Sequence, residues 1–262
     1  MSAKKSTHDD VLRARENNKS WLTRHAVAAG LRAGANFAHS NLSKTDLSGV
    51  DLRGANLEYA NCIEADLRGA DLRNTCLEVT QFERADLSAS DLREAFVGDY
   101  PFTLGATFKE ARCYGADFSS SKLHMTAFDG AMLYHTKFVC ASLNYCGFSN
   151  ANCSSANFSG ASLRRAQFIE SELICAKLNR ADLRNVILTD AEASGADFSG
   201  ADLTGAIATG ALLNASIFAN ADLTNADFRG CDLEYAVLDG AILSGTRFEG
   251  AVMPDGKVRP WS

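Results

Sequence analysis

The chain has 262 residues, of which 46% are hydrophobic and only three are proline, so it can bury a core and is not a disordered, proline-rich chain. The formal net charge of −6 opposes a basic face for the phosphates of nucleic acid, and we expect no direct nucleic-acid binding. No segment approaches the roughly 20 apolar residues of a membrane span, and the first residues lack the apolar core of a secretion signal. We therefore expect a cytoplasmic protein without membrane association.

Residues 1–34 differ in pattern from the rest of the chain. Asp9 and Asp10 stand where a helix favours negative charge, apolar residues follow at helical spacing from Leu22, and Gly30 is a stop signal. A protein built of stacked repeats exposes its core at both ends and needs caps. We expect residues 1–34 to form a short α-helical N-terminal cap for such a stack.

Residues 35–253 carry Leu or Phe at nearly every fifth position, and we call these positions the centres. One series of centres runs from Phe37 to Phe102, and a second runs from Phe108 to Met253. The residue two before a centre is usually Ala, and Gly is common two after it. A five-residue step fits neither a helix nor a continuous strand, so it predicts short sides joined by corners.

A longer period of twenty residues indicates how many sides make one coil. Leu recurs at this interval from Leu123 to Leu243, and Phe108 and Phe118 begin similar series of Phe. Coils stacked at the strand spacing of about 4.8 Å would place such residues in contact. The sequence therefore predicts an all-β solenoid, a quadrilateral (four-sided) parallel β-helix of about eleven coils, with small residues inside and Gly at the corners.

Between the two series the register slips by one residue, near 103–107. Tyr100 stands where the pattern has a small inward residue, and Pro101 lacks an amide donor. We expect a bulge or small protruding loop formed by Asp99, Tyr100 and Pro101. Two interpretations are open: an insertion without a role, or a recognition loop.

Residues 254–262 contain turn residues and no helical pattern. We expect this tail to fold over the last coil as a C-terminal cap. Trp261 could instead anchor a contact between two copies, so the sequence leaves a monomer and an end-to-end homodimer open.

No pattern in the sequence indicates catalysis. The five histidines lack a metal-binding spacing, and a filled interior would leave no pocket for a nucleophile and its base. We expect no cofactor, no metal and no enzymatic activity. Five of the eight cysteines fall on inward positions and are expected to be core residues in a reducing compartment: Cys62, Cys113, Cys146, Cys153 and Cys231.

Outward charges are the remaining functional signal. The twenty-residue period places aspartates in ladders, and one such ladder with its neighbours is the candidate acidic surface: Asp182, Asp197, Asp202, Asp222, Asp227 and Asp232. This surface either binds a partner or is a solvated face. A second candidate is a basic belt of Arg164, Arg165, Arg180 and Arg184.

An earlier ladder has cations built into its pattern. Asp51, Asp71 and Asp91 are each followed two residues later by an arginine that faces the same side. We expect this ladder to be neutralised and structural.

The units ADLRG at 65–69, ADFSG at 196–200 and ADLTG at 201–205 resemble the Ala-Asp/Asn-Leu-x-x units of the pentapeptide-repeat family, over about residues 35–253. The resemblance implies a right-handed quadrilateral β-helix. Several bacterial members imitate duplex DNA, bind DNA gyrase or topoisomerase IV and protect it from inhibitors, which gives antibiotic resistance. One hypothesis is therefore a DNA mimic of this kind, and the alternative is a general scaffold that binds an unknown protein partner through the loop or the belt.

Overall fold

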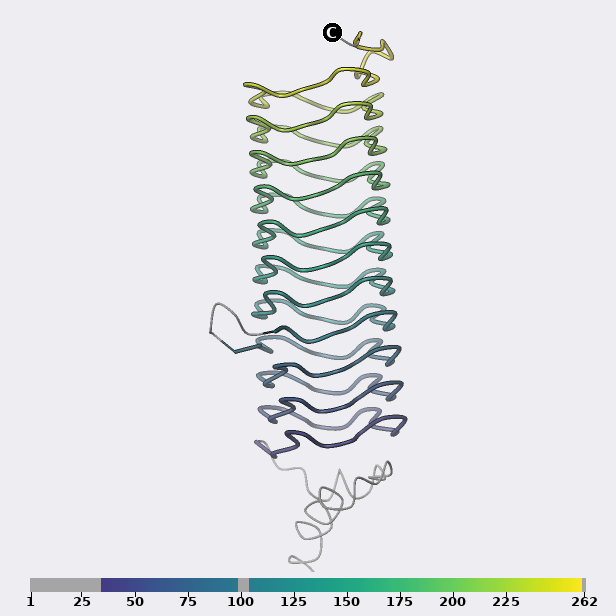
Figure 1. Cartoon of the computed structure of the whole chain (residues 1–262), viewed down its shortest axis with the longest axis vertical. Helices are drawn as coiled ribbons and strands as arrows, with labels where there is room; N and C mark the ends of the chain where they lie inside the picture. Colours follow the sequence, from purple (N-terminus) through teal and green to yellow (C-terminus); the bar gives the residue numbers. More distant parts are fainter. Residues whose placement is uncertain (1–33, 99–103, 261–262) are drawn as a thin grey trace, which may run out of the picture.

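The computed structural model describes residues 34–98 and 104–260, and in these ranges the chain forms a stack of similar coils along one long axis (Figure 1). The described residues form no α-helix and no continuous strand, and single-residue β-bridges join the coils. All bridges are parallel except the one between Val252 and Val258. The helical cap predicted for residues 1–34 falls almost wholly on residues 1–33, which lie outside the described residues.

Each side of a coil is held to the next coil by one repeated set of hydrogen bonds. On the side centred at Leu67, the Leu67 amide donates to the carbonyl of Asp86 at 2.7 Å, and the Asp86 amide donates to the carbonyl of Ala65 at 2.9 Å. The Gly69 amide adds a bond to the carbonyl of Ser88 at 2.9 Å. Pairing is limited to one bridge per side because the chain turns immediately after the centre.

The corners share one backbone conformation. After every centre from Phe37 to Leu92 and from Phe108 to Phe248, the second residue has a positive φ. The next residue donates its amide back to the carbonyl of the centre, as Ala70 does to Leu67 at 3.0 Å. A turn with positive φ at its third position is of type II, which explains the glycines predicted at corners such as Gly69.

The bridges divide the centres into four columns, one for each side of the coil. The columns begin with the bridges Asn36 to Asn56, Asn41 to Asn61, Asp46 to Asp66 and Asp51 to Asp71. We number the sides 1 to 4 in this order, and give each corner the number of the side that it follows. The twenty-residue, four-sided coil predicted from the Leu and Phe series is confirmed by these bridges.

The side chains of the centres fill the interior. Phe128 on side 2 stacks on Phe148 at 5.0 Å between ring centroids, and it meets Phe138 of side 4 edge-on at 5.5 Å. All three are 0% exposed. Almost all of the small residues two before the centres are buried as well, and at several of the polar ones the hydroxyl donates to a carbonyl, as Thr80 does to that of Leu57 at 2.7 Å.

The predicted slip of one residue is wrong in size. Gln81 pairs with Thr107 and Asp91 with Asp117, so the offset here is 26 residues instead of 20. Six residues are thus added after Val97, and the columns leave no position for a repeat centred on residue 102, which the estimate of about eleven coils includes. A five-residue period cannot distinguish one added residue from six, because the two differ by one whole repeat. The predicted loop residues Asp99, Tyr100 and Pro101 lie outside the described residues.

The C-terminal tail pairs with one side of the last coil. The Met253 amide donates to the carbonyl of Lys257 at 2.8 Å, and the Arg259 amide donates to that of Ala251 at 2.8 Å. These bonds fold residues 254–260 back along side 3. Side 1 of the last coil is less covered, since its centre Leu243 is 39% exposed. Trp261, considered as a cap or a contact between copies, lies outside the described residues.

Candidate interaction surfaces

The six candidate acidic residues lie on all four sides of the coil. Asp182, Asp202 and Asp222 form a ladder on side 1, because bridges join the first to the second and the second to the third. The other three belong to the columns of sides 2, 3 and 4, which hold Asp227, Asp232 and Asp197, respectively. Only half of the predicted acidic surface is therefore a single face.

Each of these six carboxylates is bound to its own corner. One carboxylate oxygen accepts a hydrogen bond from the amide two residues later, as Asp202 does from Thr204 at 3.0 Å. This amide belongs to the first corner residue and, in all six cases, donates to no backbone carbonyl of a neighbouring coil among the described residues. The same contact occurs at Asp182, Asp197, Asp222, Asp227 and Asp232. Asp or Asn before a centre thus has a local structural role, that of an Asx turn.

Arginines neutralise part of the acidic surface. Asp182 accepts from Arg164 at 2.5 Å and from Arg184 at 2.8 Å, and Arg184 also reaches Asp202 at 3.4 Å. Asp227 pairs with Arg229 at 2.6 Å, and the hydrogen bond from this guanidinium lowers the pKa of Asp227. Among the described residues, no lysine or arginine lies within ion-pair distance of the remaining three, Asp197, Asp222 and Asp232.

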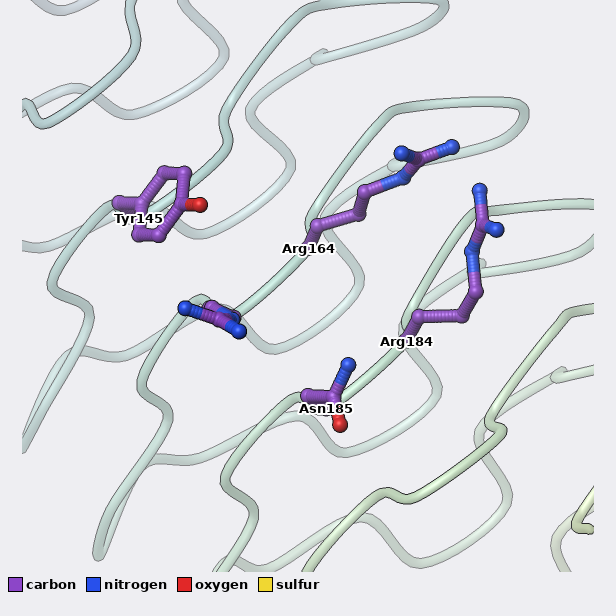
Figure 2. Close-up of a pocket in the computed structure, with 5 residues that line it drawn as sticks. Tyr145, Arg164, Arg184 and Asn185 are labelled. Atoms are coloured by element: carbon purple, nitrogen blue, oxygen red, sulfur yellow. The ribbon is translucent and has the colours of Figure 1, made fainter.

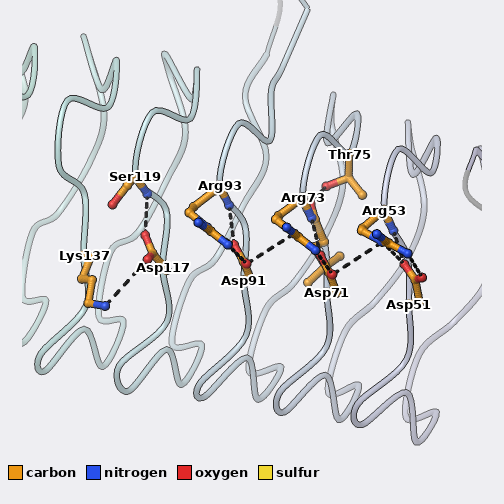
Figure 3. Close-up of polar contacts among 11 residues, drawn as sticks. Asp51, Arg53, Asp71, Arg73, Thr75, Asp91, Arg93, Asp117, Ser119 and Lys137 are labelled. Atoms are coloured by element: carbon orange, nitrogen blue, oxygen red, sulfur yellow. Dashed lines mark hydrogen bonds and ion pairs between the residues drawn. The ribbon is translucent and has the colours of Figure 1, made fainter.

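The ladder on side 4 is neutralised, as predicted from its sequence pattern. Figure 3 shows that Asp51, Asp71 and Asp91 each form an ion pair with the arginine two residues later. In each pair the Nη2 atom of the arginine lies 2.6 Å from Oδ2 of the aspartate. Arg53 and Arg73 also reach the aspartate of the next coil, at 3.6 and 3.4 Å. The side-chain hydrogen bond from Arg53 lowers the pKa of Asp51 to about 2. This ladder ties coils together.

The basic belt is divided between two corners. Arg164, Arg165 and Arg184 lie at corner 1, where they line a surface hollow of about 240 Å³ together with Tyr145 and Asn185 (Figure 2). Arg180 follows the centre Leu178 of side 4 and therefore lies at corner 4. Tyr145 and Asn185 were not predicted as site residues, although each stands twenty residues from Arg165 and the period places all three in one column.

The described residues contain no group of three or more His, Cys, Asp or Glu side chains arranged to hold a metal ion. No helix among them is long and apolar enough to cross a membrane. The five cysteines predicted at inward positions are buried, while Cys140 and Cys175 are exposed. Burial raises the pKa of the Cys62 thiol to about 12 and opposes its reactivity.

Comparison with protein families gives one match, described as pentapeptide repeats in eight copies. It covers residues 35–74 and, in overlapping segments, 111–253, which together exceed half of the chain. No curated protein sequence matches the chain.

Solved structures also resemble the coil. HetL, a pentapeptide repeat protein involved in heterocyst differentiation regulation in the cyanobacterium Nostoc, is 26% identical, with 95% of this chain and 98% of HetL covered and a TM-score of 0.64. QnrB1, a plasmid-mediated fluoroquinolone resistance protein, is 21% identical over 63% of this chain and 89% of its own, with a TM-score of 0.42. A protein of the Arabidopsis thaliana thylakoid lumen is 30% identical over 38% of this chain and 63% of its own, with a TM-score of 0.28. The family match and the likeness to HetL support the predicted right-handed quadrilateral β-helix.

Proposed function

Because the chain belongs to the pentapeptide-repeat family, whose members are generally non-enzymatic, we propose that it is a protein-binding scaffold. The observation that carries this proposal is the filled interior. In the part of the chain that the structure describes, opposite sides of the coil meet through buried rings such as Phe128 and Phe138, so the interior there offers no space for a substrate. Outward side chains on a regular rod are left to make specific contacts.

The likeness to HetL supports the same proposal. That protein is described as involved in the regulation of a differentiation process, and it is similar to nearly the whole of this chain. Regulation through binding needs a surface and no catalytic group. The partner of this chain is then sought among proteins that recognise its charged corners.

Capture of partners on the immobilised full chain tests the scaffold function. One variant carries Arg164→Glu, Arg165→Glu and Arg180→Glu, and its counterpart carries Asp202→Lys and Asp222→Lys. A scaffold that binds through the basic belt loses its partner only with the first variant. Equal capture by both variants and the unchanged chain would exclude the belt, and no captured protein under any condition would refute the scaffold.

A second candidate is a DNA mimic that binds DNA gyrase or topoisomerase IV and modulates sensitivity to inhibitors. The observation in its favour is the ladder of Asp182, Asp202 and Asp222, whose carboxylates repeat at about the 4.8 Å strand spacing. Asp222 has no cationic partner among the described residues, and such an array attracts basic DNA-binding surfaces. The ion pairs at Asp182 and Asp202 make this array shorter than the sequence suggests.

Supercoiling assays with gyrase and topoisomerase IV, with and without a quinolone, test this candidate. Inhibition or protection at micromolar protein that is lost on Asp222→Lys would support it. Absence of inhibition, protection and binding at that concentration would reject it and would leave the scaffold function standing.

A further inference from the structure

Corner 1 gathers three guanidinium groups from two successive coils. Arg164 and Arg165 follow the centre Leu163. Arg184 follows Leu183, which is the equivalent centre of the adjacent coil. Figure 2 shows Arg164 and Arg184 extending in the same direction, with Tyr145 and Asn185 bordering the same hollow. The corner is open to solvent, since Tyr145 is 55% exposed.

Many of the donors at this corner are unused. Among the described residues, the Arg164 guanidinium bonds only to Asp182, through Nε at 2.5 Å, so both of its terminal nitrogens are available. Arg184 uses Nε and Nη2 on Asp182. Among the described residues, no carboxylate lies within ion-pair distance of Arg165, whose guanidinium carbon lies 5.8 Å from the centroid of the Tyr145 ring.

The charge at the corner selects the ligand. Asp182 and Asp202 are the carboxylates paired with these arginines, so three guanidinium groups and two carboxylates leave one net positive charge. On side 2, which continues from this corner, the neighbouring outward residues Gln167 and Ile187 are uncharged. A single negative charge balances the corner, whereas a doubly charged phosphate would leave an excess negative charge beside the two aspartates.

We propose that the hollow formed by Tyr145, Arg164, Arg165, Arg184 and Asn185 binds one carboxylate of a protein partner, presented by a Glu or Asp side chain. Arg165 receives the carboxylate through its two-pronged donor face, as arginines elsewhere in this chain bind aspartates. The Tyr145 ring holds Arg165 in place and packs against the partner residue. This site rests on the scaffold function and specifies the chemistry of its partner.

Nuclear magnetic resonance of the ¹⁵N-labelled full chain tests the site through the arginine Nε–Hε signals. The probe is the peptide acetyl-Gly-Glu-Gly-amide, and matched peptides carry Gln or phosphoserine in place of Glu. We expect the Glu peptide to shift the Arg165 signal in a saturable manner and the Gln peptide to leave it unmoved. The phosphoserine peptide should bind more weakly than the Glu peptide.

Arg165→Gln and Arg180→Gln form a matched pair of variants. Both arginines are exposed, occupy the second corner position and have φ near 56° and 57°, so the two changes strain the backbone equally. We expect Arg165→Gln to weaken binding of the Glu peptide at least tenfold and Arg180→Gln to change it less than twofold. Arg165→Lys keeps the positive charge but lacks the two-pronged donor face, so it should weaken binding of the Glu peptide by an intermediate amount.

Three results would overturn the site: equal losses for the two Gln variants, no saturable shift at Arg165, or tighter binding of the phosphoserine peptide. These results are separable from failure of the scaffold function. A partner captured equally well by Arg165→Gln and by the unchanged chain would reject the site and keep the scaffold. Binding of the Glu peptide at Arg165 without any captured partner would keep the site and reject the scaffold.

Discussion

Asp222 accepts a hydrogen bond from the backbone amide of Thr224 at 2.9 Å, although it is one of the aspartates without a cationic partner among the described residues. The carboxylate of Asp222 faces outward, and one of its oxygens accepts the hydrogen bond that stabilises the corner after Leu223. The bonds from Thr224, first that of its side chain and then that of its backbone, lower the pKa of Asp222. Structural and surface roles thus coincide in one side chain.

Substitution of Asp222 separates these two roles. Asp222→Asn keeps an oxygen acceptor for the Thr224 amide and should leave the unfolding midpoint temperature nearly unchanged. Asp222→Ala leaves the amide without its partner and should cost about 1 kcal/mol in the free energy of unfolding. Thermal unfolding followed by circular dichroism measures both, and equal stability of the two variants would remove the structural role.

The ladder on side 4 predicts loss of stability in acid. The side-chain hydrogen bond from Arg53 lowers the pKa of Asp51 to about 2, and Arg73 and Arg93 lower those of Asp71 and Asp91. A lowered pKa in the folded state contributes stability that is present above the unfolded value, about 4, and is lost as the pH falls toward the folded value. The unfolding temperature should therefore be steady from pH 7 to 5 and fall between about pH 4 and 2.

A control variant assigns this acid loss to the arginines. With Arg53, Arg73 and Arg93 all changed to Gln, the three pKa values return toward their ordinary range, and the fall below pH 4 should be smaller. An identical fall in both proteins would place the acid-sensitive groups elsewhere.

The size of the insertion predicts which residues are neighbours across it. The Ala89 amide donates to the carbonyl of Tyr114 at 2.8 Å, which places Ala89 and Gly115 at stacked positions of corner 3. A double variant Ala89→Cys with Gly115→Cys should form a disulfide on oxidation, because the stacked coil spacing of about 4.8 Å lies within disulfide reach. A slip of one residue would instead stack Ala89 on Glu110. Bonding in the pair Ala89→Cys with Glu110→Cys, and none in the first pair, would contradict the 26-residue offset.

Most of the fold follows from the sequence because side-chain size is periodic in it. The column from Leu123 to Leu243 and the Phe columns need only the twenty-residue interval. The insertion near Val97 was predicted with the wrong size because a shift of six residues and a shift of one leave the same five-residue phase. The candidate acidic surface was only partly predictable. The sequence indicates that Asp202 points outward, but it does not reveal the hydrogen bond from the Thr204 amide or the ion pair with Arg184.

Corner positions that hold a residue other than Gly at positive φ are expected sites for stabilising substitutions. Val79 has a φ of 54°, a conformation that a β-branched residue adopts at a cost, whereas Asn74 at 58° is of a type that tolerates it. Val79→Gly should raise the free energy of unfolding by about 1 kcal/mol, after the greater entropy of Gly in the unfolded chain is included. Asn74→Gly, measured in the same denaturant series, should have a smaller effect. A loss of stability on Val79→Gly would mean that packing of the Val side chain outweighs its backbone strain.

The filled interior is the central claim, because it directs function to the outer surface, and the native cysteines report on it without any substitution. Cys62, Cys113, Cys146, Cys153 and Cys231 are buried, Cys76 is half-buried, and Cys140 and Cys175 are exposed. With a thiol reagent under native conditions, we expect Cys140 and Cys175 to react rapidly, Cys76 slowly, and the five buried thiols only on unfolding. Mass spectrometry of labelled peptides assigns each rate. Reaction of any of the five buried cysteines as fast as Cys140 would contradict a closed, filled coil.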